Sequence, residues 1–562
     1  MHTPSRRTVL GASIAAATSG ALAACSGSDS RPQTVDRPRP ASPPRTVARP
    51  GPTSQPGTGD GHGSAQRGGD GFVPEGPRGY VNPSGPEVIA AEKRRGSGPV
   101  RTFRLTATET TVDLGGRSVR TWAYGDDLPG REVRIKSGDI LDLTLANHLP
   151  TETTLHSHGV RMRCDMDGVP GLTQYPIRPG ADFRYRFAVD HPGTYWLHSH
   201  SGMQLDRGLY APLIVEDPRE PLSYDKEWVV VLDDWLDGVQ GSTPDKVLRQ
   251  LHGNERRAPM DMGTGNGEEH SGHEGEGDRS SGPNRVLHGS HSRILESEGG
   301  SVDYPFYLIN GRLPGAPSVF RARPGERIRL RIINAGAETP FRVALGGHKM
   351  TITHTDGYPV QHTTTDALLL GMAERYDVLV TVKDGVFPLV ALAEGKKARA
   401  LAVLRTGQGR KSLPQADVHP KELDGRIVPA RRLVPDDSVA LCHRKPDREM
   451  RVTLTGNMRQ FNWGFDHHPY SITQRHPVRE GERVRITIIN ATNMWHPLHL
   501  HGHTFAVSGI DSARARKDTA IVHPHRKLVV DFNADNPGLW MLHCHNQYHS
   551  ESGMMTILGY RT

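Results

Sequence analysis

Four short histidine motifs hold the residues best suited to chemistry in this sequence. They lie near the two ends of the chain and contain ten histidines and one cysteine, with Met554 five residues further on. They are His156-Ser157-His158, His198-Ser199-His200, His496-Pro497-Leu498-His499-Leu500-His501 and His543-Cys544-His545-Asn546-Gln547-Tyr548-His549. Two histidines, the cysteine and a weak methionine are typical of a blue-copper site. The other eight histidines, in four His-x-His pairs, are too many for one zinc ion and suit a copper cluster.

The spacing in the last motif predicts how the two sites are joined. Side chains alternate along a strand, so His543 and His545 face one way and Cys544 the other. Cys544 would then bind one site while its covalent neighbours bind the second, and an electron would cross only a few bonds. The same parity separates His496 from His499. A single His-x-His is usually an ordinary strand, but four pairs with an enclosed cysteine favour metal.

Three copies of one unit provide the elements that must hold these side chains. Each copy has an alternating run that begins with Gly and ends with Asn nine residues later, a pattern that predicts a strand. The runs are 138–147, 325–334 and 481–490. Positions nine and eleven after the Asn are His156 and His158 in copy one, His499 and His501 in copy three, and Val343 and Leu345 in copy two.

The second half of each unit repeats as well. A glycine leads after five residues to His198 in copy one, to His543 in copy three and to Val390, followed by Leu392, in copy two. The simplest arrangement therefore sets units one and three against each other, with unit two as a spacer. Alternating runs broken by turns predict antiparallel β-sandwiches, because 62 Gly and 43 Pro make about one residue in five a turn former.

Three further motifs accompany the histidines: Met166–Gly171, Gly193–Gly202 and Ala373–Asp377. With them, the chain resembles the three-domain multicopper oxidases over roughly residues 100–562, most of all the bacterial copper-resistance and actinobacterial lipoprotein members. The resemblance implies an all-β fold of three cupredoxin-like Greek-key β-sandwich domains. Their expected boundaries are 99–218, 219–432 and 433–562.

The resemblance also divides the ligands among four copper ions. The type 1 ion would be held by His496, Cys544 and His549, with Met554 axial, and the type 2 ion by His156 and His499. One type 3 ion would be held by His158, His198 and His545, and the other by His200, His501 and His543. The family oxidises a one-electron reductant at type 1 copper and reduces dioxygen to water at the other three ions.

Water formation consumes protons, so carboxylates near the cluster are expected. Asp167 stands where the family has an acidic residue beside the cluster, although Asp-Gly is also a common turn. Many relatives have Glu directly after the last histidine, where this chain has Ser550, and Glu551 could substitute. Asp167 and Glu551 are therefore the predicted catalytic acids, and the second proton route stays open.

The N-terminus predicts export and lipid attachment. Residues 5–10, Ser-Arg-Arg-Thr-Val-Leu, match a twin-arginine signal, and the apolar stretch up to Ala24 is too short to span a membrane. Leu22-Ala23-Ala24-Cys25 resembles a lipoprotein box, so residues 1–25 would be the signal. Cys25 would anchor the protein on the outer face of the cytoplasmic membrane. Residues 26–98, rich in Pro, Gly, Ser and Arg, are expected to form a disordered tether.

The overall charge fits such a location. A formal charge of +7 and a pI near 9.2 are consistent with a surface near anionic lipid, and nothing suggests nucleic-acid recognition. A monomer is expected. Cys164 and Cys442 remain once Cys25 and Cys544 are assigned, and export would permit a disulfide between them, which the sequence leaves open.

Residues 240–300 interrupt the second unit with a polar, Gly-rich stretch. Its thioethers and imidazoles suit Cu(I) capture, although a solvated loop that happens to contain histidine is the alternative. The candidate ligands are Met260, Met262, His270 and His273.

The expected function is an oxidase with O2 as acceptor and Cu(I), or else Fe(II) or a phenol, as reductant, serving copper tolerance. A laccase-type phenol oxidase is the first alternative. A non-catalytic cupredoxin scaffold or a copper-storage protein is the second, and the complete set of ligands argues against it. A two-copper nitrite reductase would not need four His-x-His pairs.

Overall fold

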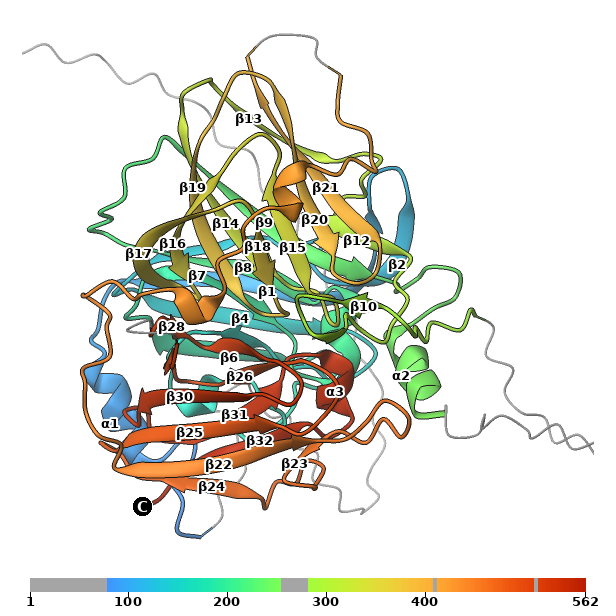
Figure 1. Ribbon diagram of the computed structural model, residues 1–562. Helices are drawn as coiled ribbons and strands as arrows, with labels where there is room; N and C mark the ends of the chain where they lie inside the picture. The colour runs from blue at the N-terminus through green and yellow to red at the C-terminus, as the bar shows by residue number, and fades with distance from the viewer. Residues whose placement is uncertain (1–77, 254–281, 408–411, 510–513) are drawn as a thin grey trace, which may run out of the picture. The chain divides into compact units, whose positions relative to one another are not determined.

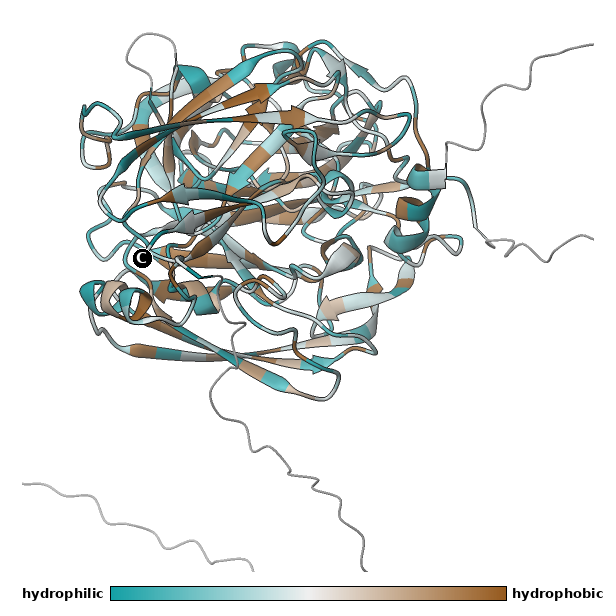
Figure 2. Ribbon diagram, turned by 90° about the horizontal axis from the view of Figure 1, so that it is seen from below, coloured by the Kyte–Doolittle hydropathy of each residue, from teal (hydrophilic) through white to brown (hydrophobic). Residues whose placement is uncertain are grey.

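The computed structural model describes residues 78–253, 282–407, 412–509 and 514–562 (Figure 1). Strands predominate and form three sandwiches of two sheets each. Apolar and polar residues alternate along many strands, as the brown and teal segments in Figure 2 show. Such strands bury one face against the opposing sheet. The all-β prediction is confirmed.

The first sandwich combines a sheet in the order β2-β1-β4-β6 with a sheet in the order β3-β8-β7-β5. Its strands are β1 (Val100–Asp113), β2 (Ser118–Tyr124), β3 (Val133–Lys136), β4 (Ile140–His148), β5 (His156–His158), β6 (Asp182–Ala188), β7 (Gly193–His198) and β8 (Tyr210–Glu216). Two 3-10 helices, η1 (Cys164–Met166) and η2 (Gly202–Arg207), follow β5 and β7.

The second sandwich has sheets in the orders β12-β9-β14-β19-β16-β17 and β13-β21-β20-β15-β18. Its strands are β9 (Lys226–Trp235), β12 (Phe306–Ile309), β13 (Ser318–Ala322), β14 (Arg327–Asn334), β15 (Phe341–Leu345), β16 (Met350–Thr355), β17 (Tyr358–Thr365), β18 (Leu368–Leu370), β19 (Arg375–Thr381), β20 (Val386–Ala393) and β21 (Ala398–Thr406). Two 3-10 helices, η4 (Lys421–Asp424) and η5 (Ala430–Arg432), follow it.

The third sandwich has sheets in the orders β23-β22-β25-β30-β27-β28 and β24-β32-β31-β26-β29. Its strands are β22 (Arg448–Thr455), β23 (Gly464–Phe465), β24 (Arg475–Val478), β25 (Arg483–Asn490), β26 (His496–Leu500), β27 (Phe505–Val507), β28 (Arg516–Lys517), β29 (Thr519–Val522), β30 (Lys527–Asn533), β31 (Leu539–Cys544) and β32 (Met555–Tyr560). Helix α3 (Gln547–Glu551) joins β31 to β32.

The repeated Gly-to-Asn run forms the same inner strand in each sandwich, namely β4, β14 and β25, and each is parallel to the first strand of its domain. The terminal Asn side chain makes equivalent hydrogen bonds in all three domains. Asn147 Nδ2 donates to Ile177 O at 2.8 Å, and its Oδ1 accepts from Leu149 N at 3.0 Å. Asn334 and Asn490 make the matching bonds. The Asn thus fixes the turn that leads to the next strand.

Part of the expected tether is folded instead. Residues Pro86–Arg94 form α1, which buries Val88 and Ala91, and Tyr80 makes a β-bridge with Arg561. Proline in the first turn favours a helix start, and the two small apolar residues give the helix one face to bury. The prediction that the tether extends to residue 98 is therefore wrong for 78–98, while residues 26–77 lie outside the described part.

The interrupting stretch is also partly folded. Helix α2 (Pro244–His252) buries Val247 and Leu251, and β10 (His291–Ser292) pairs with β11 (Ser297–Glu298). Gln250 accepts a hydrogen bond from Arg285 N at 2.9 Å and donates one to Pro283 O at 3.1 Å. The described residues on the far side of 254–281, which itself lies outside the described ranges, are thus bonded to α2. The structureless-loop alternative is wrong for the flanks.

The sequence left open whether Cys164 and Cys442 form a disulfide, and the structure shows that they do not. Cys164 is buried, where its Sγ donates to Leu539 O at 3.3 Å, while Cys442 is exposed and both are free thiols. The thiol of Cys164 therefore has a backbone partner of its own. Within the described ranges, the structure contains no helix long and apolar enough to cross a membrane.

Candidate metal centre

The His2Cys set converges in the third domain from β26, β31 and α3. Cys544 Sγ lies 3.7 Å from His496 Nδ1 and 3.8 Å from His549 Nδ1, and the two Nδ1 atoms lie 3.2 Å apart. All three side chains are fully buried. Met554 is buried as well, and Cys544 N donates to its carbonyl oxygen at 3.0 Å.

An N-terminal helix cap explains why the chain after β31 turns back toward Cys544. The Asn546 side chain accepts hydrogen bonds from Tyr548 N at 3.1 Å and His549 N at 3.2 Å, so it starts α3 directly after the strand. Met554 N donates to His549 O at 3.0 Å and closes the loop. One short helix therefore brings His549 and Met554 back to the cysteine.

Burial keeps these groups ready for a cation. It lowers the pKa of His496 to about 3 and that of His549 well below its ordinary value, so both imidazoles are neutral and present lone pairs. Burial also raises the pKa of the Cys544 thiol. A bound cation would offset that cost because it stabilises the thiolate directly.

Aromatic rings cover this set on one side. The Trp463 ring centroid lies 4.2 Å from that of His549, and the Phe461 ring lies 5.8 Å from it. His252, the last residue of α2, packs 5.7 Å from Phe461, and its Nε2 is 2.8 Å from Ser552 Oγ. The second domain therefore contributes part of the cover.

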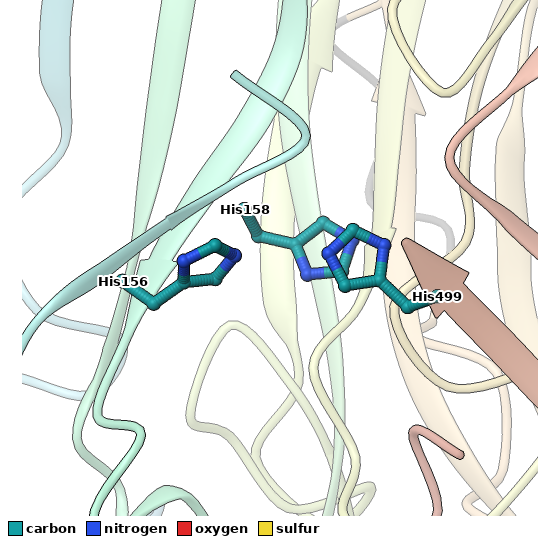
Figure 3. A group of neighbouring side chains, drawn as sticks. All are labelled: His156, His158 and His499. Atoms are coloured by element: carbon teal, nitrogen blue, oxygen red, sulfur yellow. The ribbon is translucent and has the colours of Figure 1, made fainter. Parts of the chain in front are cut away.

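The eight remaining histidines meet between the first and third domains. Their ligand nitrogens form three groups in which all atoms lie within 4.8 Å of one another. The groups are His156, His158 and His499; His158, His198 and His545; and His200, His501 and His543. In the first group the rings of His158 and His499 stack with centroids 3.7 Å apart, and His156 lies beside them (Figure 3).

The tautomers show that a cation fits. His156, His198, His499 and His543 each donate Nδ1–H to a backbone carbonyl, at 2.7 to 2.9 Å, which leaves Nε2 with its lone pair. Within the described ranges, Nε2 of the first three has no hydrogen-bond partner although it is buried. Unpaired buried acceptors are costly, and metal-bound histidines commonly donate their other nitrogen in this way.

His501 and His543 face each other through nitrogens that carry no proton. His501 donates Nδ1–H to Asp167 Oδ2 at 2.9 Å, so its Nε2 is an acceptor. That atom faces Nε2 of His543 at 3.1 Å, and the two lone pairs repel unless a cation lies near both. The donor set is therefore chemically incomplete without a metal and suited to copper.

Asp167 is fully buried beside this cluster. Its carboxylate accepts from His501, its carbonyl accepts from His156 Nδ1 at 2.7 Å, and its Oδ1 lacks a hydrogen-bond partner among the described residues. Gly168 takes a φ of 83°, and a Cβ there would collide with the Leu155 carbonyl. The Asp-Gly turn thus serves the positioning of the carboxylate.

Ser550, rather than Glu551, lies against the cluster. Ser550 Oγ is 3.5 Å from His543 Nδ1, while Glu551 accepts from Gln547 Nε2 at 3.3 Å. Burial, assisted by Asp245, raises the pKa of Glu551 to about 7. The role expected of Glu551 stays a prediction. Met260, Met262, His270 and His273 lie outside the described residues.

Sequence reasoning missed Asp518. Its Oδ1 accepts from His158 Nε2 at 3.0 Å, and its carbonyl accepts from His499 Nδ1. Burial would raise the pKa of Asp518, but the charge and hydrogen bonds of Arg375 outweigh burial and hold it well below its ordinary value. No motif marked Asp518, although Arg375 belongs to the noted run Ala373–Asp377.

Comparison with known proteins agrees with this geometry. Family models described as multicopper oxidase match residues 106–220, 226–409 and 443–561. The chain is 47% identical over 475 residues to the multicopper oxidase MmcO of Mycobacterium tuberculosis, covering 84% of this chain and 90% of the relative.

Two further likenesses are more distant. A copper resistance protein A homolog of Pseudomonas syringae pv. tomato is 29% identical over 545 residues, covering 80% of this chain and 91% of the relative. The crystal structure of Fet3p, a multicopper oxidase that functions in iron import, superposes with a TM-score of 0.67 at 22% identity, covering 82% and 90% of the two chains. At 22% identity, the likeness to Fet3p supports the fold alone.

Proposed function

The chain belongs to the multicopper oxidases, and from that membership we propose that its reductant is Cu(I) and its role is copper tolerance. It is an oxidoreductase that uses O2 and holds one type 1, one type 2 and two type 3 copper ions. The copper-resistance relative supports the proposed role.

We assign the ligands as the resemblance implies. The type 1 ligands are His496, Cys544, His549 and Met554. The support is the convergence of the donor atoms of His496, Cys544 and His549, together with the three histidine groups, which include His156 and His499 for the type 2 ion. Met554 is assigned from the resemblance, and its backbone bonds to Cys544 and His549 place it in the same loop. The remaining six form the type 3 groups already described.

Bound copper supplies one-electron redox chemistry and the site at which O2 becomes water. The chain supplies the connection: Cys544 lies between His543 and His545 in sequence, so a few covalent bonds join the type 1 position to both type 3 groups. Asp167, buried against His501 and His156, orients both rings and holds a carboxylate where protons are needed.

One observation carries the choice of reductant. The candidate Cu(I) ligands follow α2 in the chain, and His252 at the end of α2 packs on Phe461, which in turn packs on the ring of His549. Since the type 1 histidines are fully buried under Phe461 and Trp463, a bulky phenol would have no direct contact with them. A small ion such as Cu(I), bound by side chains of that stretch, suits this cover better.

The test replaces residues 254–281 by a short Gly-Ser linker and keeps α2 and residues 282–303. We expect kcat/KM for Cu(I), followed by oxygen uptake, to fall about tenfold or more, because a tethered ligand raises the local Cu(I) concentration. Copper content and phenol kcat/KM should stay unchanged.

A length-matched control replaces Met260, Met262, His270 and His273 by Leu and Gln. It should reproduce the loss if thioethers and imidazoles are responsible. Equal loss for Cu(I) and phenol would instead indicate a general role in access. No loss for either would mean that the stretch is a solvated insertion and would overturn the proposal.

We further propose export by the twin-arginine route and a lipid anchor at Cys25. The support is the arginine pair in residues 5–10 and the box that ends at Cys25. Cys25→Ala should move the protein from the membrane fraction to the soluble fraction, or block its processing, because several acyl chains are needed for lasting attachment. Normal processing with unchanged membrane association would refute the anchor.

A further inference from the structure

The middle domain has no ligand of the copper sites assigned above, yet its run Ala373–Asp377 reaches the histidine cluster. Arg375, at the start of β19, is fully buried. Its Nη1 and Nη2 donate to the two carboxylate oxygens of Asp518 at 2.8 and 2.5 Å. Its Nε donates to Thr194 O in β7 at 3.1 Å. One guanidinium therefore joins all three domains.

The same carboxylate contacts the cluster. Asp518 Oδ1, which accepts from Arg375, also accepts from His158 Nε2 at 3.0 Å. This leaves the lone pair of His158 on Nδ1, which is buried and lacks a partner within the described part of the chain. His158 thus presents the opposite nitrogen from His156, His198 and His499.

The middle domain also holds the backbone around Asp518. Asp356 Oδ2 accepts from the backbone N–H groups of Asp518 and Thr519, both at 3.2 Å. Lys517 Nζ forms buried ion pairs with Asp356 and Glu374, each at 3.1 Å. Such a fully paired buried network fixes one geometry and would be costly to break at any one member.

Packing leaves the Arg375–Asp518 pair little freedom. Gly159, directly after His158, has a φ of 83°, and a Cβ there would collide with both Arg375 Nη2 and Asp518 Oδ2. The ion pair packs directly against the backbone that follows His156 and His158. A displacement of the pair would therefore be transmitted to that backbone.

We infer that Arg375 is a positioning residue for the trinuclear site: through Asp518 it sets which nitrogen of His158 faces the metal. Copper retention therefore depends on domain 2, although that domain contributes no assigned copper ligand. The inference rests on the proposed ligand set but not on the proposed reductant. Removal of groups that orient a metal ligand typically weakens metal binding about 10–100-fold.

The test compares Arg375→Lys and Asp518→Asn with the wild type after copper loading. Lys keeps the charge but loses the planar fork, and Asn keeps the shape but loses the charge. Each copper-loaded protein is dialysed against increasing chelator. Bound copper is then counted, and the type 1 absorption and the type 2 paramagnetic resonance signal are recorded.

We expect both variants to keep the type 1 absorption and to lose the other copper at about 10- to 100-fold lower chelator concentration, with the type 2 signal altered. Arg329→Lys is the matched control, because Arg329 is buried in an ion pair with Asp377 and does not touch Asp518. This control should retain all copper as the wild type does.

Two outcomes overturn the inference. In the first, both variants retain copper as the wild type does. In the second, type 1 copper is lost together with the rest, and the metal-free variants unfold at a lower temperature, which would mean that the pair only holds domains together. If Asp518→Asn does not fold, Arg375→Lys decides alone. A wild type without type 1 absorption would instead refute the ligand assignment.

Discussion

In domain 1 the strands β5 and β7 place His156 opposite His198, and in domain 3 the strands β26 and β31 place His499 opposite His543. In domain 2 the matching strands β15 and β20 place Ala344, not Val343, opposite Val390. The register has slipped by one residue. Because a slip of one residue reverses the face, the positions that hold ligands elsewhere point to opposite sides of this sheet.

The two faces of β15 in domain 2 are then covered separately. Val343 and Leu345 belong to the main apolar core, while Val390 and Ala344 pack in a small cluster with Leu423 of η4. The domain thus closes this sheet with its own chain, whereas domains 1 and 3 complete their sites with each other's histidines. A shared site therefore needs both the residues and the register.

Removal of the joining thiolate should have the largest effect. In Cys544→Ser, the blue absorption should vanish, because the thiolate is the charge-transfer donor to type 1 copper. Domain 3 would then lack its own site, and the shared cluster should keep about three ions per chain as the ligand assignment implies. Absorption spectra and copper counts check this, and a blue band of full strength would contradict the assignment.

Asp167→Asn tests the shared cluster from the domain 1 side. The amide can keep the contact with His501 but cannot carry a proton in the same way, so turnover should fall about 10²- to 10⁴-fold at an unchanged copper count. Steady-state rates with saturating reductant and oxygen measure it. Unchanged turnover would remove Asp167 from the proton route.

Histidines in the middle domain should not recreate a site. Val343→His and Val390→His together put imidazoles on opposite faces, and each should cost about 1–3 kcal/mol as an unpaired buried polar group. Chemical unfolding gives the cost, and metal analysis should find no additional copper. An additional bound ion would mean that the register in this domain is not the one described.

The smallest effect is expected where the three domains meet. Asp206 of η2 accepts from Tyr548 OH at 2.6 Å and from Tyr304 OH at 3.1 Å, and burial, then Asp234, raises its pKa well above the ordinary value. A raised pKa in the folded state means that stability falls as pH rises through it.

Asp206→Asn keeps the acceptor and removes the titration. The thermal midpoint of this variant should exceed that of the wild type, and the difference should grow from about pH 5 to about pH 8. Thermal scans across that range measure it. A difference that shrinks with pH would show that Asp206 is stabilised as an anion.

The sequence predicted the repeated strands and the opposite facing of Cys544 and its two neighbours, because side-chain parity follows directly from residue order. The division of the donor atoms into groups was implied by the family resemblance instead. The sequence did not predict the register slip, since Val343 and Val390 fit an apolar face in either register. It also missed Asp518 and the cover of Phe461 and Trp463, because their roles arise from contacts between distant segments. The fold of residues 78–98 was missed since two small apolar residues give a weak helical pattern.

The parallel strand β24 pairs with β32, whose partner β31 carries Cys544. Residues 543–554 follow every other proposed ligand in the chain, so a chain that stops before residue 543 has neither copper site complete. The histidines of domain 1 are made long before these partners, and such long-range pairing is slow to form, so they remain without a finished site until residues 543–545 are in place. Copper can be captured in its final arrangement only after these residues have emerged and paired, which makes metal content a direct report of whether β31 and α3 have folded.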